Sequence, residues 1–271
     1  MLLGNLPRIQ LAKIGIVVNT PSKRPKKRRS PGWVPNQHGA WAMLASPLAV
    51  GALAGGLAWI HLPLAAFWFA GYFAFFATTL WLKARRMPRH FPPVRFYVLL
   101  ASALGILVLL LQPQLLKWAP FFALPLGVGL YAASHKKERA LLAGIATISG
   151  SALMTVVAYD AGATGTDLNR AWLLAAAQFL YFAGTVFYVK TIIRERDNKN
   201  FYRLSVGYHA LAVVLIGLLF GFTGSALTLV LVFVILLDRA VLVPKFKVTP
   251  KQIGIGEIFS TIAVALASLF A

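Results

Sequence analysis

Nine apolar runs divide most of the chain, and basic residues fill alternate gaps between them. The runs cover approximately residues 40–60, 63–82, 96–112, 118–134, 139–158, 171–189, 204–222, 225–243 and 253–270. About 20 apolar residues cross the hydrocarbon core of a bilayer, with a usable range of about 17–25. A backbone in lipid must satisfy its own hydrogen bonds, so each run is predicted to be a helix. The third and fourth runs are short, and we expect them to be tilted, bent or extended by their neighbours.

The Lys and Arg residues segregate to one side of this pattern. Of the 27, the other side keeps only Lys117 and Arg170, and the rest lie in the N-terminal arm and the loops after the second, fourth, sixth and eighth runs. Cytoplasmic loops of membrane proteins carry such an excess. We therefore predict an all-α bundle of nine transmembrane helices, N-terminus inside and C-terminus outside, in a bacterial cell (inner) membrane.

The composition excludes several other classes of protein. Hydrophobic residues make up 59% of the chain and the mean hydropathy is +0.72, too apolar for a soluble domain. The chain contains no cysteine, which excludes disulfides, thiolate catalysis and thiolate metal sites. The net charge of +20 suggests nucleic acid, but the cations lie between hydrophobic runs, so no nucleic-acid partner is expected.

Residues 1–35 form a basic arm, and residues 36–271 form a single nine-helix domain. The cationic cluster Lys23–Arg29 follows the first apolar stretch, which is the wrong order for a secretory signal. We expect the arm to be disordered and to lie on the anionic cytoplasmic leaflet.

The loop and helix ends over residues 190–209 mix charges of both signs more densely than any other stretch. Lys190, Arg194 and Asn198 recur every four residues, which predicts one helical face able to hold an anion by charge-assisted hydrogen bonds. Glu195 and Lys199 have the spacing of an i,i+4 salt bridge.

The loop after the second run carries five cations and no acid. Lys83 and Arg86 face one way if the helix continues through them. Anion binding and ordinary positive-inside anchoring both explain this charge. The segment Thr78–Lys83 is also similar to Thr185–Lys190, since each reads Thr, two residues, an aromatic, an aliphatic and Lys. The similarity indicates either an internal repeat or the composition common at membrane interfaces.

Two further helix starts carry candidate residues. Gln37 and His38 lie at the start of the first run. They are candidate ligands for a substrate head group, and His38 is a candidate for proton transfer. The alternative is a structural role as helix cap and interfacial anchor. Glu138 opens the fifth run, where a carboxylate also complements the helix dipole.

Two ionisable residues fall inside predicted spans. His209 in the seventh run is a functional candidate or a hydrogen-bonded structural residue. Glu257 in the ninth requires a cation or a proton, and an Arg or Lys from a neighbouring loop is the simplest partner. Asp238 and Arg239 close the eighth run, and the small residues Thr147–Ser151 favour close helix packing.

Four motifs carry a family resemblance over about residues 33–271. The motifs are Pro35–Trp41 (PNQHGAW), Lys83–Arg86 (KARR), Glu138–Leu142 (ERALL) and Lys190–Arg196 (KTIIRER). Together they resemble the YwiC-like family of bacterial integral membrane proteins, which implies a multi-pass membrane protein and no particular activity.

The topology also resembles that of the UbiA superfamily of intramembrane prenyltransferases. In that superfamily the loops after the second and sixth helices carry Asp-rich motifs that bind magnesium and a prenyl diphosphate. Here the first of these loops has no acid and the second has only Glu195 and Asp197. Magnesium prefers several oxygen ligands, so it would bind here only with a substrate that brings most of the negative charge. No cofactor is predicted, and Lys and Arg would hold a phosphate directly.

The resulting hypothesis is a cytoplasm-facing pocket, UbiA-like, that binds a membrane lipid with an anionic or isoprenoid phosphate group. It is either catalytic, as a UbiA-like transferase, or a degenerate relative. A transporter for a small anion or lipid, with His209 and Glu257 coupling protons, and a scaffold without a ligand are the alternatives. The catalytic candidates are His38, Glu138, Glu195 and His209. The anion-binding candidates are Gln37, His38, Lys83, Arg86, Lys137, Arg139, Lys190, Arg194, Arg196 and Asn198.

Overall fold

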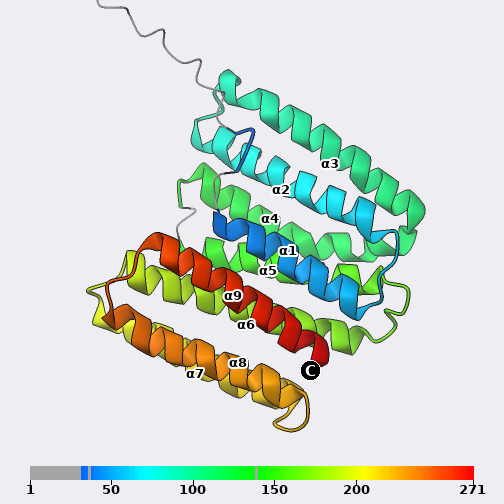
Figure 1. Ribbon diagram of the computed structural model, residues 1–271. Coiled ribbons are helices and arrows are strands. Elements are labelled where there is room, and N and C mark those ends of the chain that lie inside the picture. The colour runs from blue at the N-terminus through cyan, green and yellow to red at the C-terminus, as the bar shows by residue number, and fades with distance from the viewer. Residues whose placement is uncertain (1–31, 36–37, 138–139) are drawn as a thin grey trace, which may run out of the picture. The chain divides into compact units, whose positions relative to one another are not determined.

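A computed structural model describes residues 32–35, 38–137 and 140–271 of the chain (Figure 1). Over these ranges it is helical, without strands. The helices are α1 (His38–Ala54), α2 (His61–Lys83), α3 (Phe91–Leu111), α4 (Ala119–Ser134), α5 (Leu141–Asp160), α6 (Leu168–Ile193), α7 (Lys199–Phe220), α8 (Ala226–Leu242) and α9 (Pro250–Phe270).

The predicted all-helical membrane class is confirmed. Each of the nine apolar runs corresponds to one helix of the described ranges, and eight helical segments there are long and apolar enough to cross a membrane. The remaining helix, α1, has 17 residues and spans about 25 Å, slightly less than the hydrocarbon core.

The third and fourth spans are extended by short 3-10 turns, as expected. Pro88–His90 leads into α3 and Pro113–Trp118 leads into α4, which gives continuous apolar segments of 24 and 22 residues. Proline starts both turns because its missing N–H needs no partner in the first turn of a helix.

The helices form an array with α1 near its centre (Figure 1). α1 packs against α5, α6 and α9, whereas α2 pairs with α3 at one edge and α7 pairs with α8 at the other. Burial follows this order. Within the most apolar 18-residue stretch of each span, 61% of the residues are buried in α5 and in α6, but only 11% in the segment that contains α3. The lipid-facing helices are thus hydrophobic all round, which explains why the whole chain is so apolar.

Two glycines let α1 approach α5 closely. A Cβ on Gly51 would lie 2.2 Å from the carbonyl oxygen of Thr155, and one on Gly55 would lie 2.3 Å from that of Tyr159. Glycines four residues apart are a known signature of close helix packing in membranes. The spacing of Gly51 and Gly55 is therefore a signal in the sequence for this contact.

The two cations expected on the outer side both have structural partners. Lys117 lies 3.0 Å from both carboxylate oxygens of Asp160, one of which also accepts a 2.9 Å bond from the indole of Trp118. Arg170 donates to the carbonyl of Leu269 near the end of α9, at 3.2 Å. These contacts join α4, α5, α6 and α9 at the same end of the bundle, so both cations contribute to packing.

The described helical part of the chain is preceded by an ordered segment, residues 32–35. The hydroxyl of Tyr97 on α3 donates to the carbonyl of Trp33 at 2.7 Å, and the Trp33 ring contacts Phe96 and Tyr97. Most of the expected basic arm, residues 1–31, lies outside the described residues.

Candidate functional site

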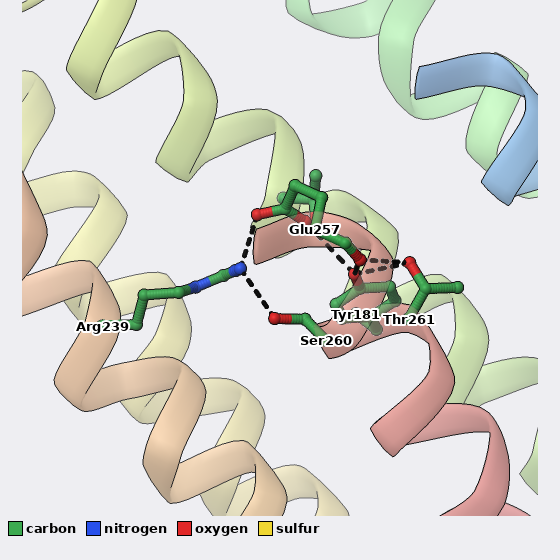
Figure 2. Close-up of polar contacts among 6 residues, drawn as sticks. Tyr181, Arg239, Glu257, Ser260 and Thr261 are labelled. Atoms are coloured by element: carbon green, nitrogen blue, oxygen red, sulfur yellow. Dashed lines mark hydrogen bonds and ion pairs between the residues drawn. The ribbon is translucent and has the colours of Figure 1, made fainter. Parts of the chain in front are cut away.

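The densest membrane-embedded polar cluster of the described chain lies between α6, α8 and α9 (Figure 2). Glu257 is at its centre. One carboxylate oxygen accepts from the guanidinium of Arg239 at 2.5 Å. The other accepts from the hydroxyls of Thr185 at 2.9 Å and Tyr181 at 3.2 Å. Both oxygens are therefore engaged by donors from two neighbouring helices.

A second set of contacts surrounds this ion pair. Arg239 also donates to the hydroxyl of Ser260 at 3.0 Å, and the Tyr181 hydroxyl lies 2.8 Å from that of Thr261 (Figure 2). The guanidinium carbon of Arg239 sits 4.1 Å from the ring centroid of Tyr188, a cation–π contact. Within the cluster the charge of each group is thus met by an opposite charge, a dipole or a ring face.

The connection between α8 and α9 places the two charges opposite each other. Arg239 lies one turn before the end of α8. A capping box of Thr249 and Gln252 fixes the start of α9, and Glu257 follows about 10 Å further along the helix. Both groups therefore lie inside the predicted spans, in the half of the bundle that holds the α8–α9 connection.

Burial makes this pair unusual. The side chains of Arg239 and Glu257 are only 14% and 15% exposed. The Arg239 Nε atom is buried and has no hydrogen-bond partner among the described residues. Ionisable groups in membrane helices are uncommon and mark ligand or ion pathways by default. The cluster is thus a candidate for holding an anion at Arg239 or a proton at Glu257.

The sequence anticipated part of this cluster. The expectation that Glu257 pairs with an Arg or Lys is confirmed, but the partner, Arg239, lies in α8 and not in a loop. Tyr181 and Thr185 were not anticipated as members of the site. They lie four residues apart on α6, with Tyr188 following, which is the spacing of one helical face.

His209 lies well inside α7. The helix begins at Lys199, so His209 is about three turns from its start. Its side chain is buried, and Nδ1 donates to the carbonyl of Ser205 at 2.7 Å. The ring is thereby held within its own helix and faces Gly184 of α6.

The predicted helical face in the α6–α7 connection is wrong, because α6 ends at Ile193. Arg194 and Glu195 both donate their N–H groups to the carbonyl of Lys190 in a terminating turn. Asn198 is the N-cap of α7, where its side chain accepts from the N–H of Phe201. Asn is a strong N-cap residue, and this competing role breaks the four-residue periodicity.

The expected pair between Glu195 and Lys199 does not form for the same reason. Glu195 lies in the turn and Lys199 opens the next helix, so they share no helical face. The Glu195 carboxylate instead accepts from the amide of Asn198 at 2.9 Å. Arg196 donates to the carbonyl of Phe246 at 3.3 Å, which ties this connection to the one between α8 and α9.

The cations after α2 also leave the helix. α2 ends at Lys83, and Arg85 and Arg86 take left-handed backbone conformations with φ of 53° and 59°. The condition that the helix continues through Arg86 is therefore not met. Arg86 lies 6.0 Å from the ring centroid of Trp81.

The two cationic connections belong to helices separated in the array. α1, α4 and α5 lie between α2 and α6 (Figure 1). Two shallow hollows of the described chain lie elsewhere, one between α4 and α5 and the other beside Arg170. Neither is lined by the anion-binding candidates Lys83, Arg86, Lys190 or Arg194.

Several predicted site residues fall where no placement is given. Gln37, Glu138 and Arg139 lie outside the described residues, and so does the side chain of His38, although α1 begins there. Lys137 is exposed in the turn after α4. Among described residues, no group of three or more His, Asp and Glu side chains is placed to hold a metal ion.

Comparison with known proteins places the chain in a family. The family model described as YwiC-like protein matches residues 34–159. The protein named "Uncharacterized protein YwiC" of Bacillus subtilis (strain 168) is 35% identical over 179 residues, which cover 66% of this chain and 74% of that protein. An "Uncharacterized protein" of Haemophilus influenzae is 29% identical over 225 residues, covering 83% and 92%.

No solved structure gives a significant match, so the topological likeness to the UbiA superfamily stays a prediction. The relative from B. subtilis, together with the family model, confirms the resemblance that the four motifs suggested. This multi-pass membrane protein belongs to the YwiC-like family.

Proposed function

We propose that the protein binds the phosphate-bearing head group of an anionic lipid, a polyprenyl phosphate included, at the cytoplasmic end of its bundle. One observation carries the proposal. The described chain has three residues other than glycine with positive φ: Arg85, Arg86 and Lys136, at 53°, 59° and 57°. All three are cations, and they follow the cytoplasmic ends of α2 and α4.

The backbone conformation of these residues is energetically unfavourable. A left-handed conformation costs about 1–2 kcal/mol for a residue with a Cβ, and glycine is the usual choice at such helix ends. Strained residues of this kind cluster at ligand clamps, where the surrounding structure holds them in place. Cations at positions that favour glycine support a role for their charge.

The chemistry of the site fits phosphate. Guanidinium and ammonium groups bind phosphate oxygens by charge-assisted hydrogen bonds without a metal ion. A cation at the surface of an anionic leaflet contributes about 1 kcal/mol to lipid binding. Since both relatives are bacterial proteins, the membrane concerned is proposed to be the bacterial cell (inner) membrane.

Glycine substitutions change the charge and the backbone strain together, and two measurements tell the two effects apart. Arg85→Gly, Arg86→Gly and Lys136→Gly each remove a cation and relieve a strained conformation. Binding of phosphatidylglycerol, measured by native mass spectrometry of the purified protein, should fall about fivefold per cation. The free energy of unfolding in detergent should stay the same or rise by up to about 1 kcal/mol.

The matched control is Lys251→Gly. Lys251 is exposed near the cytoplasmic start of α9 and its φ is not positive. Its replacement removes one charge without relieving strain, and glycine inside a helix lowers stability by about 1 kcal/mol. Loss of lipid equal to that caused by Lys136→Gly would show that only total charge matters and would refute a built site.

Transport of a small anion is a second candidate, favoured by the buried pair of Arg239 and Glu257. Their position inside the membrane, bonded to Tyr181 and Thr185 of a third helix, is typical of ion and substrate pathways. In proteoliposomes, pH-dependent anion uptake should be abolished by Glu257→Gln and by Arg239→Gln. Uptake that is absent in the unaltered protein, or independent of pH, would remove this candidate.

A further inference from the structure

A lipid-facing groove runs along α4 beside the start of α5. It has a volume of about 320 Å³ and is lined by Ala123, Leu124, Gly127, Val128, Tyr131 and Leu142. Every lining side chain is apolar except for the phenol of Tyr131. Ligand sites commonly begin at about 300 Å³, so the groove is of a size for a slender apolar group.

A glycine keeps the floor of the groove open. A Cβ on Gly127 would meet no other atom within 4 Å, apart from its own helix and chain neighbours. On the opposite side of α4, Gly129 faces the ring of Phe75 on α2, which would lie 2.7 Å from an added Cβ. One glycine therefore serves helix packing, whereas the other leaves space toward the lipid.

The cytoplasmic end of the groove meets the cationic turn after α4. Tyr131 is one helical turn before His135, and their rings lie 4.2 Å apart. The Nδ1 atom of His135 donates to the carbonyl of Tyr131 at 2.9 Å. The N–H groups of Lys136 and Lys137 bond back to Ala133 and Ala132, so this turn is held directly above the groove.

The apolar groove and the cationic turn follow each other in the same order as the acyl chain and the charged head group of a lipid. A phospholipid places its phosphate at the interface and its chains in the hydrocarbon core. A zwitterionic lipid gains little binding energy from the ammonium groups of Lys136 and Lys137, whereas an anionic head group gains binding energy from both. The strained φ of Lys136 (57°) holds one of these cations next to the end of the groove.

We infer that the groove between α4 and α5 holds one chain of an anionic membrane lipid whose phosphate lies against Lys136 and Lys137. This inference rests on the proposed function and assigns it to one place in the fold. It differs from a pocket between the connections after α2 and α6, since the groove is formed by α4 and α5 alone.

The experiment uses phosphatidylglycerol with a photoreactive diazirine on one acyl chain, bound to the full-length protein. Phosphatidylcholine with the same label is the comparison. Crosslinks from phosphatidylglycerol should concentrate in residues 123–142 and exceed those from phosphatidylcholine about fivefold or more. Crosslinks spread evenly over the lipid-facing helices would overturn the inference.

Substitutions test the contribution of the groove to lipid binding separately from that of the cations. Gly127→Leu fills the groove and should lower the 123–142 crosslinks to the level found on the other lipid-facing helices, because the acyl chain no longer has room there. Gly207→Leu is the matched control, because Gly207 is an exposed α7 glycine that also has open space at its Cβ. It should leave these crosslinks unchanged, and equal effects of the two leucines would refute the groove.

The outcomes also distinguish the inference from the proposed function. If phosphatidylglycerol is preferred and Lys136→Gly weakens it, but Gly127→Leu does not, the head-group site stands and the groove fails. If phosphatidylglycerol and phosphatidylcholine bind equally and no cation matters, the proposed function fails, and the groove proposal fails with it.

Discussion

Ser151 of α5 donates its hydroxyl to the carbonyl of Met43 in α1. Met43 lies four residues before Pro47, which is inside α1 and has no N–H to bond that carbonyl. One turn of α1 therefore lacks a hydrogen bond within its own helix, and a neighbouring helix supplies the donor. In lipid, where water is absent, such a donor is what allows a proline inside a membrane helix.

Loss of this donor should destabilise the fold. We expect Ser151→Ala to lower the free energy of unfolding by about 0.6–1.7 kcal/mol, the range for hydrogen bonds between membrane helices. Denaturation of the purified protein in mixed micelles measures it. Pro47→Ala restores the N–H, so Ser151→Ala in that background should have a much smaller effect. Equal effects in both backgrounds would contradict the proposed coupling.

The pair of Arg239 and Glu257 should show strongly non-additive energetics. Glu257→Leu leaves a buried guanidinium without its counter-charge and should destabilise the protein by about 3–5 kcal/mol. Adding Arg239→Met removes the remaining charge and should recover most of this loss. Denaturation of the two single variants and the double variant tests the expectation, and a double variant less stable than either single one would refute it.

The contact between α1 and α5 should tolerate no side chain at its glycines. Gly51→Ala would place a methyl group 2.2 Å from the Thr155 carbonyl oxygen, on backbone that cannot yield without moving the helix. Overpacking of this kind typically destabilises by about 1–3 kcal/mol. Gly39→Ala in the same helix meets nothing within 4 Å and is the control. The folded yield and melting temperature should fall for Gly51→Ala alone.

The orientation of the chain is open to a direct test because it contains no cysteine. Thr166 is exposed in the outer connection between α5 and α6, and Lys137 is exposed after α4. In spheroplasts, a membrane-impermeant maleimide should label Thr166→Cys directly and Lys137→Cys only after permeabilisation. The reverse pattern would place the C-terminus inside and invalidate the cytoplasmic assignment of the cations.

Sequence patterns that reflect the lipid solvent predicted the structure correctly. Hydrophobic length and charge segregation predicted the nine α-helices that the described residues form, because lipid imposes the same requirement on every span. The sequence predicted that the partner of Glu257 is a cation, because a buried carboxylate requires one. The helical face through Lys190, Arg194 and Asn198 failed because a four-residue spacing says nothing about where a helix ends.

By itself, then, the sequence determined the class, the number of helices, the membrane setting and the family, all of which follow from local composition and motifs. Only the tertiary structure decided that Tyr181 and Thr185 meet Glu257, that Arg85, Arg86 and Lys136 are strained, and that Gly127 opens a groove. These features depend on which helix faces which neighbour and on how each helix terminates. Packing among similar apolar surfaces sets both, and a hydropathy pattern carries little information about it.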